Sequence, residues 1–248
     1  MGIYLIVCPL VFLAGFVDSI AGGGGLISLP AYMFAGIPVH NAIATNKLSS
    51  STGTVVSTAR LIKNKKVDGG FVPGTVIGAL IGSVAGANLA LIISDHILKM
   101  VLVVILPIVA FCVLRDKNMD VEVPVGMTKN KQYLIAIACS LVIGCYDGFY
   151  GPGTGTFLLL VFTKLAKIPL EKATGNVKIV NLSSNISALI TFILAGKILW
   201  GLGLAASCFS IAGHYVGAGM VVNNGVKVIK PIILIVLVLL LVKVVSGI

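Results

Sequence analysis

Two aspartates stand inside apolar sequence, each shortly before a cluster of glycines. Asp18 precedes the run Gly22-Gly23-Gly24-Gly25, and Asp147 precedes Gly151-Pro152-Gly153-Thr154-Gly155. Glycine lets a backbone approach a ligand closely, and the apolar stretch after each cluster would begin a helix whose free N–H groups attract anions. Four consecutive glycines exceed what helix packing needs. We therefore predict an anion site at two backbone breaks, with these substrate-binding residues: Gly22, Gly23, Gly24, Gly25, Gly151, Gly153 and Gly155.

The two aspartates fit two different roles. A carboxylate in an apolar segment is costly and usually functional. Burial disfavours its charged form, so Asp18 and Asp147 are candidates for proton coupling. An aspartate also caps free backbone N–H groups readily, which would make both residues structural. Their matching positions before the two breaks fit either role.

A polar helix is predicted after each break. Residues 42–62 and 172–195 carry lysine, hydroxyl and amide side chains at helical spacing. Such a density of polar side chains does not face lipid cheaply, so they should line the bundle interior or a water-filled path. Each lysine fits contact with an anionic substrate, pairing with an aspartate, or extension to the membrane interface. The further substrate-binding candidates are Asn46, Lys47, Ser50, Thr54, Asn176, Lys178, Asn181 and Asn185.

Other reactive residue types predict no catalytic, metal or cofactor site. His214 lies alone in an apolar segment, which favours a hydrogen-bonded core residue over a proton relay. The five cysteines lie in apolar runs without a CxxC pair, so neither a disulfide framework nor a zinc site is indicated. There is no GxxxxGK[ST], HExxH or GxSxG motif, which argues against an ATP-driven pump and against a hydrolase.

The composition indicates that these residues sit in a membrane. The 248 residues are 58% hydrophobic and 10% charged, whereas a soluble domain is about 25% charged. A soluble enzyme, a disordered chain and a coiled coil are excluded. Apolar residues come in runs, which favours helices over a β-barrel. The net charge of +10 comes from bases in short connectors, so we expect lipid and no nucleic acid as a partner.

Ten apolar segments follow one another along the chain. Two of them, 25–36 and 155–166, are shorter than the roughly 20 residues that cross a bilayer, and each follows a glycine break. The other eight are 3–21, 42–62, 69–93, 97–114, 132–150, 172–195, 198–222 and 227–246.

The order of motifs predicts an internal repeat. Asp18 and Asp147 lie 129 residues apart, and Ala44-Thr45 matches Ala173-Thr174 at the same offset. The offset then becomes 131, the distance from Lys47 to Lys178 and from Gly82 to Gly213. We predict a first repeat (1–114), a connector (115–131) and a second repeat (132–248).

Charge predicts that the repeats have opposite orientations. The connector after 42–62 is basic, and its counterpart after 172–195 carries one lysine. The connector before 42–62 has no lysine or arginine, whereas its counterpart before 172–195 is basic. Under the positive-inside rule, this exchange is typical of inverted topology. We expect a cytoplasmic connector and both termini outside. The predicted fold is all-α: an integral membrane, polytopic helical bundle of two inverted repeats, each with a glycine-broken, re-entrant-like hairpin and three spans.

Two blocks carry a resemblance to a known family. GFVDSIAGGGGLISLPAYMFAGIPVHNAIATNKLSSSTGT (15–54) resembles the first half of the TauE/SafE sulfite-exporter permeases. GCYDGFYGPGTGTFLLL (144–160) and ATGNVKIVNLSSNISAL (173–189) are similar to the family's second motif. The resemblance implies a cytoplasmic-membrane (inner-membrane) transporter of small sulfur-containing anions such as sulfite, sulfonates or thiosulfate. It extends to Thr45 and Thr174 as well as to the glycine breaks.

The sequence thus predicts a secondary transporter that works by alternating access and is no enzyme. The resemblance implies that it is an exporter. An anion channel and a carrier of another small organic anion are the alternatives. A non-transporting scaffold and a sulfur-transfer enzyme built on Cys145 are less favoured. A monomer and a homodimer both fit, and the sequence names neither the anion nor the coupling ion.

Overall fold

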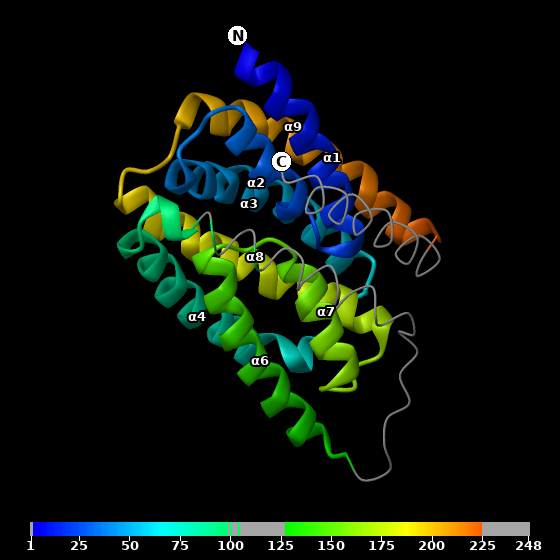
Figure 1. Ribbon diagram of the computed structural model, residues 1–248. Coiled ribbons are helices and arrows are strands. Elements are labelled where there is room, and N and C mark those ends of the chain that lie inside the picture. The colour runs from blue at the N-terminus through cyan, green and yellow to red at the C-terminus, as the bar shows by residue number, and fades with distance from the viewer. Residues whose placement is uncertain (1, 99, 101–103, 105–126, 225–248) are drawn as a thin grey trace.

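The computed structural model describes residues 2–98, 100, 104 and 127–224 (Figure 1). The predicted segment 227–246 and nearly all of 97–114 lie outside the described residues, as does the predicted connector up to residue 126. The third span that the sequence predicts for each repeat is therefore not part of the description below.

The described residues form helices and connectors, without a strand. The helices begin and end within three residues of the predicted apolar segments, so these predictions are confirmed. The first half contains α1 (Gly2–Ala21), α2 (Gly25–Phe34), α3 (Val39–Lys63), a 3₁₀ turn (Gly69–Phe71) and α4 (Val72–Ile92). The second half contains α6 (Lys129–Phe149), α7 (Thr154–Lys164), α8 (Leu170–Leu194) and α9 (Trp200–Asn224).

Within the described part, five helical stretches are long and apolar enough to cross a membrane. They are Gly2–Ile20, Gly69–Ile92, Lys129–Phe149, Leu170–Leu194 and Trp200–Asn223. Helices α2 and α7 have 10 and 11 residues, too few to cross about 30 Å of hydrocarbon. Helix α3 is 25 residues long but too polar to qualify. Length and composition therefore make this a multi-pass membrane protein.

Prolines and glycines set the ends of the inner helices. Pro38 and Pro169 stand at the N-caps of α3 and α8, where the fixed φ of proline suits the entry into a helix. Gly22, Gly151 and Gly153 have φ values of 78°, 92° and 78°. Side chains rarely adopt this left-handed conformation, so glycine is required at these three positions. Both breaks predicted from the sequence thus occur in the structure.

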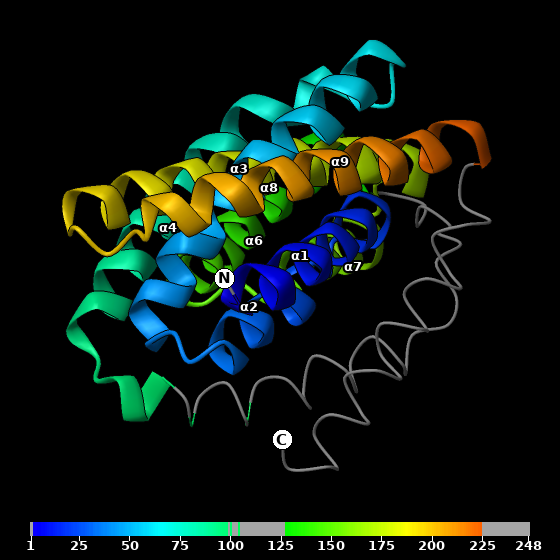
Figure 2. The same ribbon diagram turned by 90° about the horizontal axis from the view of Figure 1, so that it is seen from above.

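The helices form two groups that exchange one helix between the halves (Figures 1 and 2). Helix α9 packs against α1 and α3, and helix α4 packs against α6 and α8. Helices α3 and α8 pack against each other between the groups. Each group therefore contains three helices from one half and one from the other.

Glycines allow the exchanged helices to approach closely. A Cβ added at Gly82 of α4 would overlap the Leu141 carbonyl oxygen of α6, and one added at Gly213 of α9 would overlap the Phe12 carbonyl oxygen of α1. Small residues let membrane helices touch through their backbones. The glycine positions on α4 and α9 are therefore packing surfaces.

Helices α3 and α8 require one correction to the sequence alignment. Each spans 25 residues, and they begin at Val39 and Leu170, which are 131 residues apart. The change of offset therefore falls before α3, since α7 is one residue longer than α2 and the connector after α7 is one residue longer than the connector after α2. Thr45 corresponds to Asn176 and not to Thr174, because a two-residue insertion inside a helix would have rotated all later side chains.

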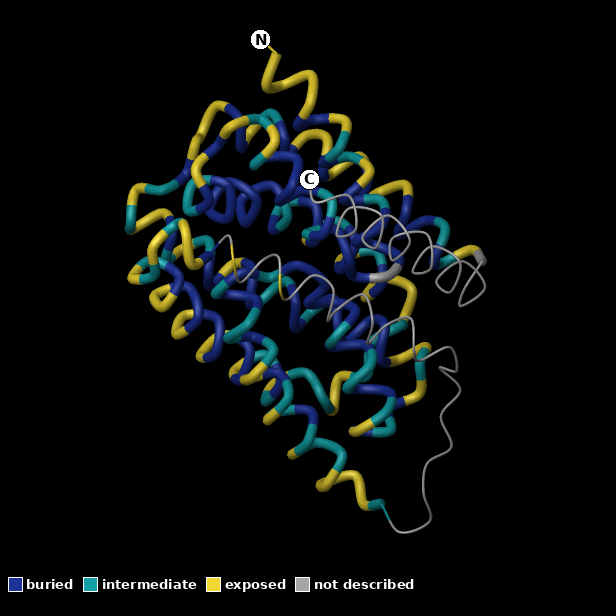
Figure 3. Tube along the Cα trace, in the orientation of Figure 1, coloured by how far each residue is buried: buried dark blue, intermediate teal, exposed yellow. Residues whose placement is uncertain are grey.

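Burial follows the pattern of a membrane bundle (Figure 3). Apolar side chains cover the outside: Leu5, Ile92 and Leu194 are 77%, 82% and 83% exposed. Two lysines nevertheless lie inside, since Lys47 and Lys178 are each 2% exposed. Lipid can solvate the outer apolar surface but not buried charges, so the charges must find partners within the protein.

Candidate functional site

The two glycine breaks meet in the centre of the structure. A Cβ placed on Gly22 would lie 2.5 Å from the Cα atom of Gly155, and one placed on Gly155 would lie 2.5 Å from the Cα atom of Gly22. A Cβ on Gly25 would come within 3.1 Å of the Pro152 Cα atom. Backbone therefore touches backbone where α1–α2 meets α6–α7, an approach that only glycine permits.

A cavity opens beside this contact, with about 280 Å³ of unoccupied space when its open side is included. It is bounded by both breaks and by the polar faces of α3 and α8. Eleven of its twelve lining residues are among those singled out from the sequence, and Thr154 is the exception. The lining consists of Asp18, Gly22, Gly25, Asn46, Lys47, Ser50, Asp147, Gly151, Thr154, Gly155, Asn181 and Asn185.

Thr154 belongs to the break itself. It is the first residue of α7, and its hydroxyl donates to the Gly151 carbonyl oxygen at 2.7 Å. The sequence signal was present, because Thr154 stands between two of the predicted glycines. Gly25 and Gly155 lie in the first turns of α2 and α7. Backbone N–H groups in a first helical turn have no acceptor within their own helix, but those of Leu26, Ile27 and Ser28 already donate to the Gly23 and Gly24 carbonyl oxygens. Gly25 and Gly155, which line the cavity, are therefore the first-turn residues whose N–H groups suit an anion.

Two buried ion pairs join the halves reciprocally. Lys47 of α3 reaches Asp147 of α6, with Nζ 2.9 Å from Oδ2. Lys178 of α8 reaches Asp18 of α1, with Nζ 3.1 Å from Oδ2. Both lysines are buried, so extension to a membrane interface does not describe them. Of the interpretations offered by the sequence, pairing with the aspartates is the one that the structure contains.

The Lys47 pair is extended by amide groups. Lys47 Nζ also donates to Asn185 Oδ1 at 2.9 Å, and Asn185 Nδ2 donates to Asn181 Oδ1 at 3.2 Å. Asp147 accepts a second hydrogen bond from the Ser184 hydroxyl at 2.6 Å. These contacts satisfy the buried charges, which would otherwise cost several kcal/mol each.

The Asp18 pair is extended in a different way. Asp18 Oδ1 accepts from the Gly24 backbone N–H at 3.2 Å, so this aspartate does cap its break. Asp18 Oδ2 lies 3.2 Å from His214 Nε2 of α9, and Lys178 also donates to the Asp18 carbonyl oxygen. The sequence assigned His214 to the core because a lone histidine reveals no partner before the helices are packed.

The remaining predicted site residues lie around the cavity or away from it. Thr54 has its hydroxyl 3.5 Å from His214 Nε2, and Gly24 lines a neighbouring cavity. Gly153 is the N-cap of α7, and Gly23 is buried within its break. Lys178 contacts the cavity only through Asp18, and neither cavity includes Asn176.

Asn176 instead ties α8 to the connector after α3. Its Oδ1 accepts from the Asp68 backbone N–H at 2.9 Å. Thr45 Oγ1 accepts in the same way from the Leu199 backbone N–H at 3.1 Å. Thr45 and Asn176 are 131 residues apart, and so are Asp68 and Leu199. Both tethers hold an inner helix against a connector of the other half.

Comparison with known proteins places this arrangement in a family. Residues 7–244 match the family model described as "Sulfite exporter TauE/SafE". The chain belongs to the TauE/SafE family. It is therefore a multi-pass membrane transporter and not an enzyme.

Similar proteins carry consistent names. The chain is 38% identical to "Probable membrane transporter protein YfcA" of Escherichia coli (strain K12) over 229 residues, which cover 90% of this chain and 82% of the relative. It is 35% identical to "Probable membrane transporter protein ORF9" of Sinorhizobium sp over 95% of this chain and 90% of the relative. A "Probable membrane transporter protein" of Haemophilus influenzae is 34% identical, with 90% and 87% covered. No solved structure matches the chain significantly.

Proposed function

We propose that the protein is a secondary transporter of small sulfur-containing anions, such as sulfite, sulfonates or thiosulfate, across the cytoplasmic membrane. The observation that carries this proposal is the cavity where the two breaks meet, because it combines a buried ammonium, amides, a hydroxyl and two helix N-termini. The family name supports sulfite-like chemistry and export.

The donors around the cavity suit an oxyanion. Lys47 Nζ has three N–H bonds, and Asp147 and Asn185 accept two of them. The third is available to an anion without loss of the ion pair. Ser50 and Asn46 line the same space on α3, and the first turns of α2 and α7 add backbone N–H groups. Sulfur oxyanions present several acceptor oxygens, which such a ring of donors would hold.

Alternating access would come from movement of one half against the other. The reciprocal ion pairs, the reciprocal tethers of Thr45 and Asn176, and the exchanged helices α4 and α9 support a pair of inverted repeats. Inverted repeats commonly place a substrate site at their interface, where broken helices meet. The basic connectors support a topology with both termini outside.

Counterflow in proteoliposomes tests the proposal. Vesicles are preloaded with unlabelled sulfite, methanesulfonate, thiosulfate or chloride, and the uptake of labelled anion is followed. We expect transient accumulation with a sulfur anion and none with chloride. Folded protein that shows no counterflow with any of the sulfur anions would refute the proposal, and flux without saturation or counterflow would indicate a channel.

A matched pair of variants ties transport to the cavity. Asn181→Ala removes an amide from the cavity lining, whereas Asn88→Ala removes one from an exposed position on α4. We expect Asn181→Ala to reduce counterflow at least tenfold, because a lost hydrogen bond to a charged group is worth about 1.5–3 kcal/mol. Asn88→Ala should transport as the unchanged protein does. Equal activity of both variants would place the substrate elsewhere.

A further inference from the structure

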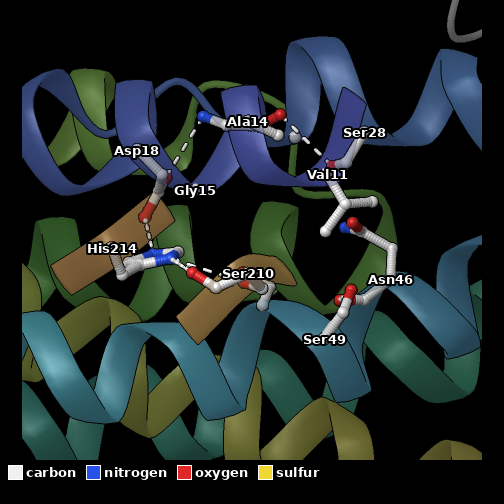
Figure 4. Close-up of a pocket in the computed structure, with 12 residues that line it drawn as sticks. Val11, Ala14, Gly15, Asp18, Ser28, Asn46, Ser49, Ser210 and His214 are labelled. Carbon is white, nitrogen blue, oxygen red and sulfur yellow. Dashed lines mark hydrogen bonds and ion pairs between the residues drawn. The ribbon is translucent and has the colours of Figure 1, made fainter. Parts of the chain in front are cut away.

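A second cavity is lined by Asp18 but not by its ion-pair partner Lys178. It has about 210 Å³ of unoccupied space when its open side is included, and Asp18, Asn46, Ser210 and His214 are among its lining residues (Figure 4). Within this lining, Asp18 and His214 are the two titratable side chains. Figure 4 shows the His214 ring between the Asp18 carboxylate and the Ser210 backbone.

The hydrogen-bond partners of His214 determine how many hydrogens the pair carries. Its Nδ1 atom lies 2.9 Å from the Ser210 carbonyl oxygen, which can only accept, and 3.4 Å from the Ser210 hydroxyl, which can turn its hydrogen away. The shorter contact is a hydrogen bond only if Nδ1 carries a hydrogen. Its Nε2 atom lies 3.2 Å from Asp18 Oδ2. An ionised carboxylate also only accepts, so a second hydrogen must lie between Nε2 and Oδ2. The Thr54 hydroxyl, at 3.5 Å from Nε2, is too distant to replace it.

The surroundings favour this hydrogen on the ring. Lys178 Nζ lies 3.1 Å from Asp18 Oδ2, and the Gly24 N–H donates to Oδ1. Both contacts stabilise the ionised carboxylate, so a hydrogen between Nε2 and Oδ2 is held on Nε2. With hydrogens on both ring nitrogens of His214, the cluster has three cations, Lys47, Lys178 and His214, against the two aspartates.

The other charged groups around α9 do not alter this balance. Helices α1 and α3 pack against α9. Helix α1 contributes Asp18, and α3 contributes Lys47 together with Arg60, whose guanidinium donates to the Tyr215 carbonyl oxygen at an exposed position. Lys178 reaches the cluster from α8. Each of the two lysines is paired with an aspartate, so a protonated His214 ring adds a cation to these two pairs.

The corresponding position in the other half has no such proton. Ser83 lies 131 residues before His214, and its hydroxyl donates to the Ser184 carbonyl oxygen at 2.6 Å. The Ser184 hydroxyl in turn donates to Asp147 Oδ2. Gly53 corresponds to Ser184, and a Cβ at Gly53 would overlap the His214 ring. The second aspartate is thus satisfied by a hydroxyl that never releases its hydrogen at physiological pH.

We propose that His214 and Asp18 together bind one exchangeable proton, and that binding of this proton is linked to binding of the anion. The link to the anion rests on the proposed function. The proton comes from the solution on one side, occupies Nε2 of His214, and adds one positive charge beside a cavity that accepts a negative one. Its release leaves a bare Nε2 lone pair against a carboxylate oxygen, which favours separation of α9 from α1 and departure of the anion.

Nuclear magnetic resonance of labelled histidine tests the proton directly. The ¹⁵N resonances of His214 are identified by comparison with His214→Gln, because His40 and His96 also contribute signals. We expect both ring nitrogens of His214 to be protonated at neutral pH, and Asp18→Asn to give a neutral ring. A neutral His214 beside an ionised Asp18 carboxylate, seen by ¹³C shift, would overturn the proposal.

The pH dependence of counterflow tests the link to the anion. Methanesulfonate and thiosulfate are used between about pH 6 and pH 8 because their own charges stay constant there. One linked proton changes apparent affinity by up to about tenfold per pH unit. We expect this dependence in the unchanged protein and in His96→Gln, an exposed control, but a flat profile in His214→Gln.

The two experiments fail independently. A His214→Gln protein that keeps the full pH dependence overturns the link, whatever the anion. An absence of counterflow in the unchanged protein refutes the proposed function, and the resonances of His214 still decide whether the proton is bound.

Discussion

The pair Lys47–Asp147 offers a quantitative test of how the halves are held together. At 2.9 Å and an effective dielectric constant of about 20, the two charges attract each other by about 6 kcal/mol. Desolvation offsets much of this gain, but removal of one partner leaves the other buried and unpaired. Lys47→Met or Asp147→Asn alone should therefore lower the free energy of unfolding by about 3–5 kcal/mol.

The assay is thermal unfolding of purified protein in detergent, with both single variants and the double variant. For a chain of this length, 1 kcal/mol corresponds to about 2–4 °C, so each single variant should lower the midpoint by about 6–20 °C. The double variant should be more stable than the sum of the single effects predicts, by about 1–3 kcal/mol, because no unpaired charge remains.

The exposed pair Lys66–Glu171 provides the control. These side chains are 33% and 67% exposed, and such surface pairs contribute about 0–1 kcal/mol. Lys66→Met should lower the midpoint by no more than about 4 °C. The reasoning fails if Lys47→Met is as mild as Lys66→Met, or if the effects at Lys47 and Asp147 simply add, since either result means that the two charges do not depend on each other.

Two glycine substitutions test the close contacts at the site. Gly22→Ala should abolish counterflow and lower stability by more than about 3 kcal/mol, because it combines a left-handed backbone with overlap against Gly155. Gly36→Ala, at a similar φ of 79° but in open space, should cost only about 1–2 kcal/mol and should transport normally. Gly53→Ala should displace the His214 ring and flatten the pH profile, and an unchanged profile would show that His214 does not depend on this space.

Local sequence properties predicted the helices and the breaks well. An apolar run of about 20 residues predicts a membrane-spanning helix, and a glycine cluster predicts a break, because bilayer thickness and backbone freedom act on the segment itself. Most of the residues that line the cavity were named from the sequence, because Lys47 and Ser50 share a polar face of α3 and Asn181 and Asn185 share one of α8. Whether these residues bind a substrate stays a prediction.

Long-range partners could not be predicted in the same way. The choice of Asp147 for Lys47, and of His214 for Asp18, depends on how helices of one half pack against helices of the other. Asn176 shows the limit within one helix. It was grouped with Lys178, but two residues along a helix rotate a side chain by about 200°, which turns Asn176 toward the connector at Asp68.

The two halves satisfy their buried aspartates with different side chains. In each half a buried aspartate faces a lysine from the other half and needs one more donor, and the donor is Ser184 in one case and His214 in the other. A serine hydroxyl keeps its hydrogen at physiological pH, whereas an imidazole can lose one. If a serine hydroxyl were the donor to both aspartates, movement of the halves against each other would not be linked to a proton. Under our proposal, His214 at the position that matches Ser83, together with Gly53 at the position that matches Ser184, creates that link, while the other ion pair keeps the halves in register.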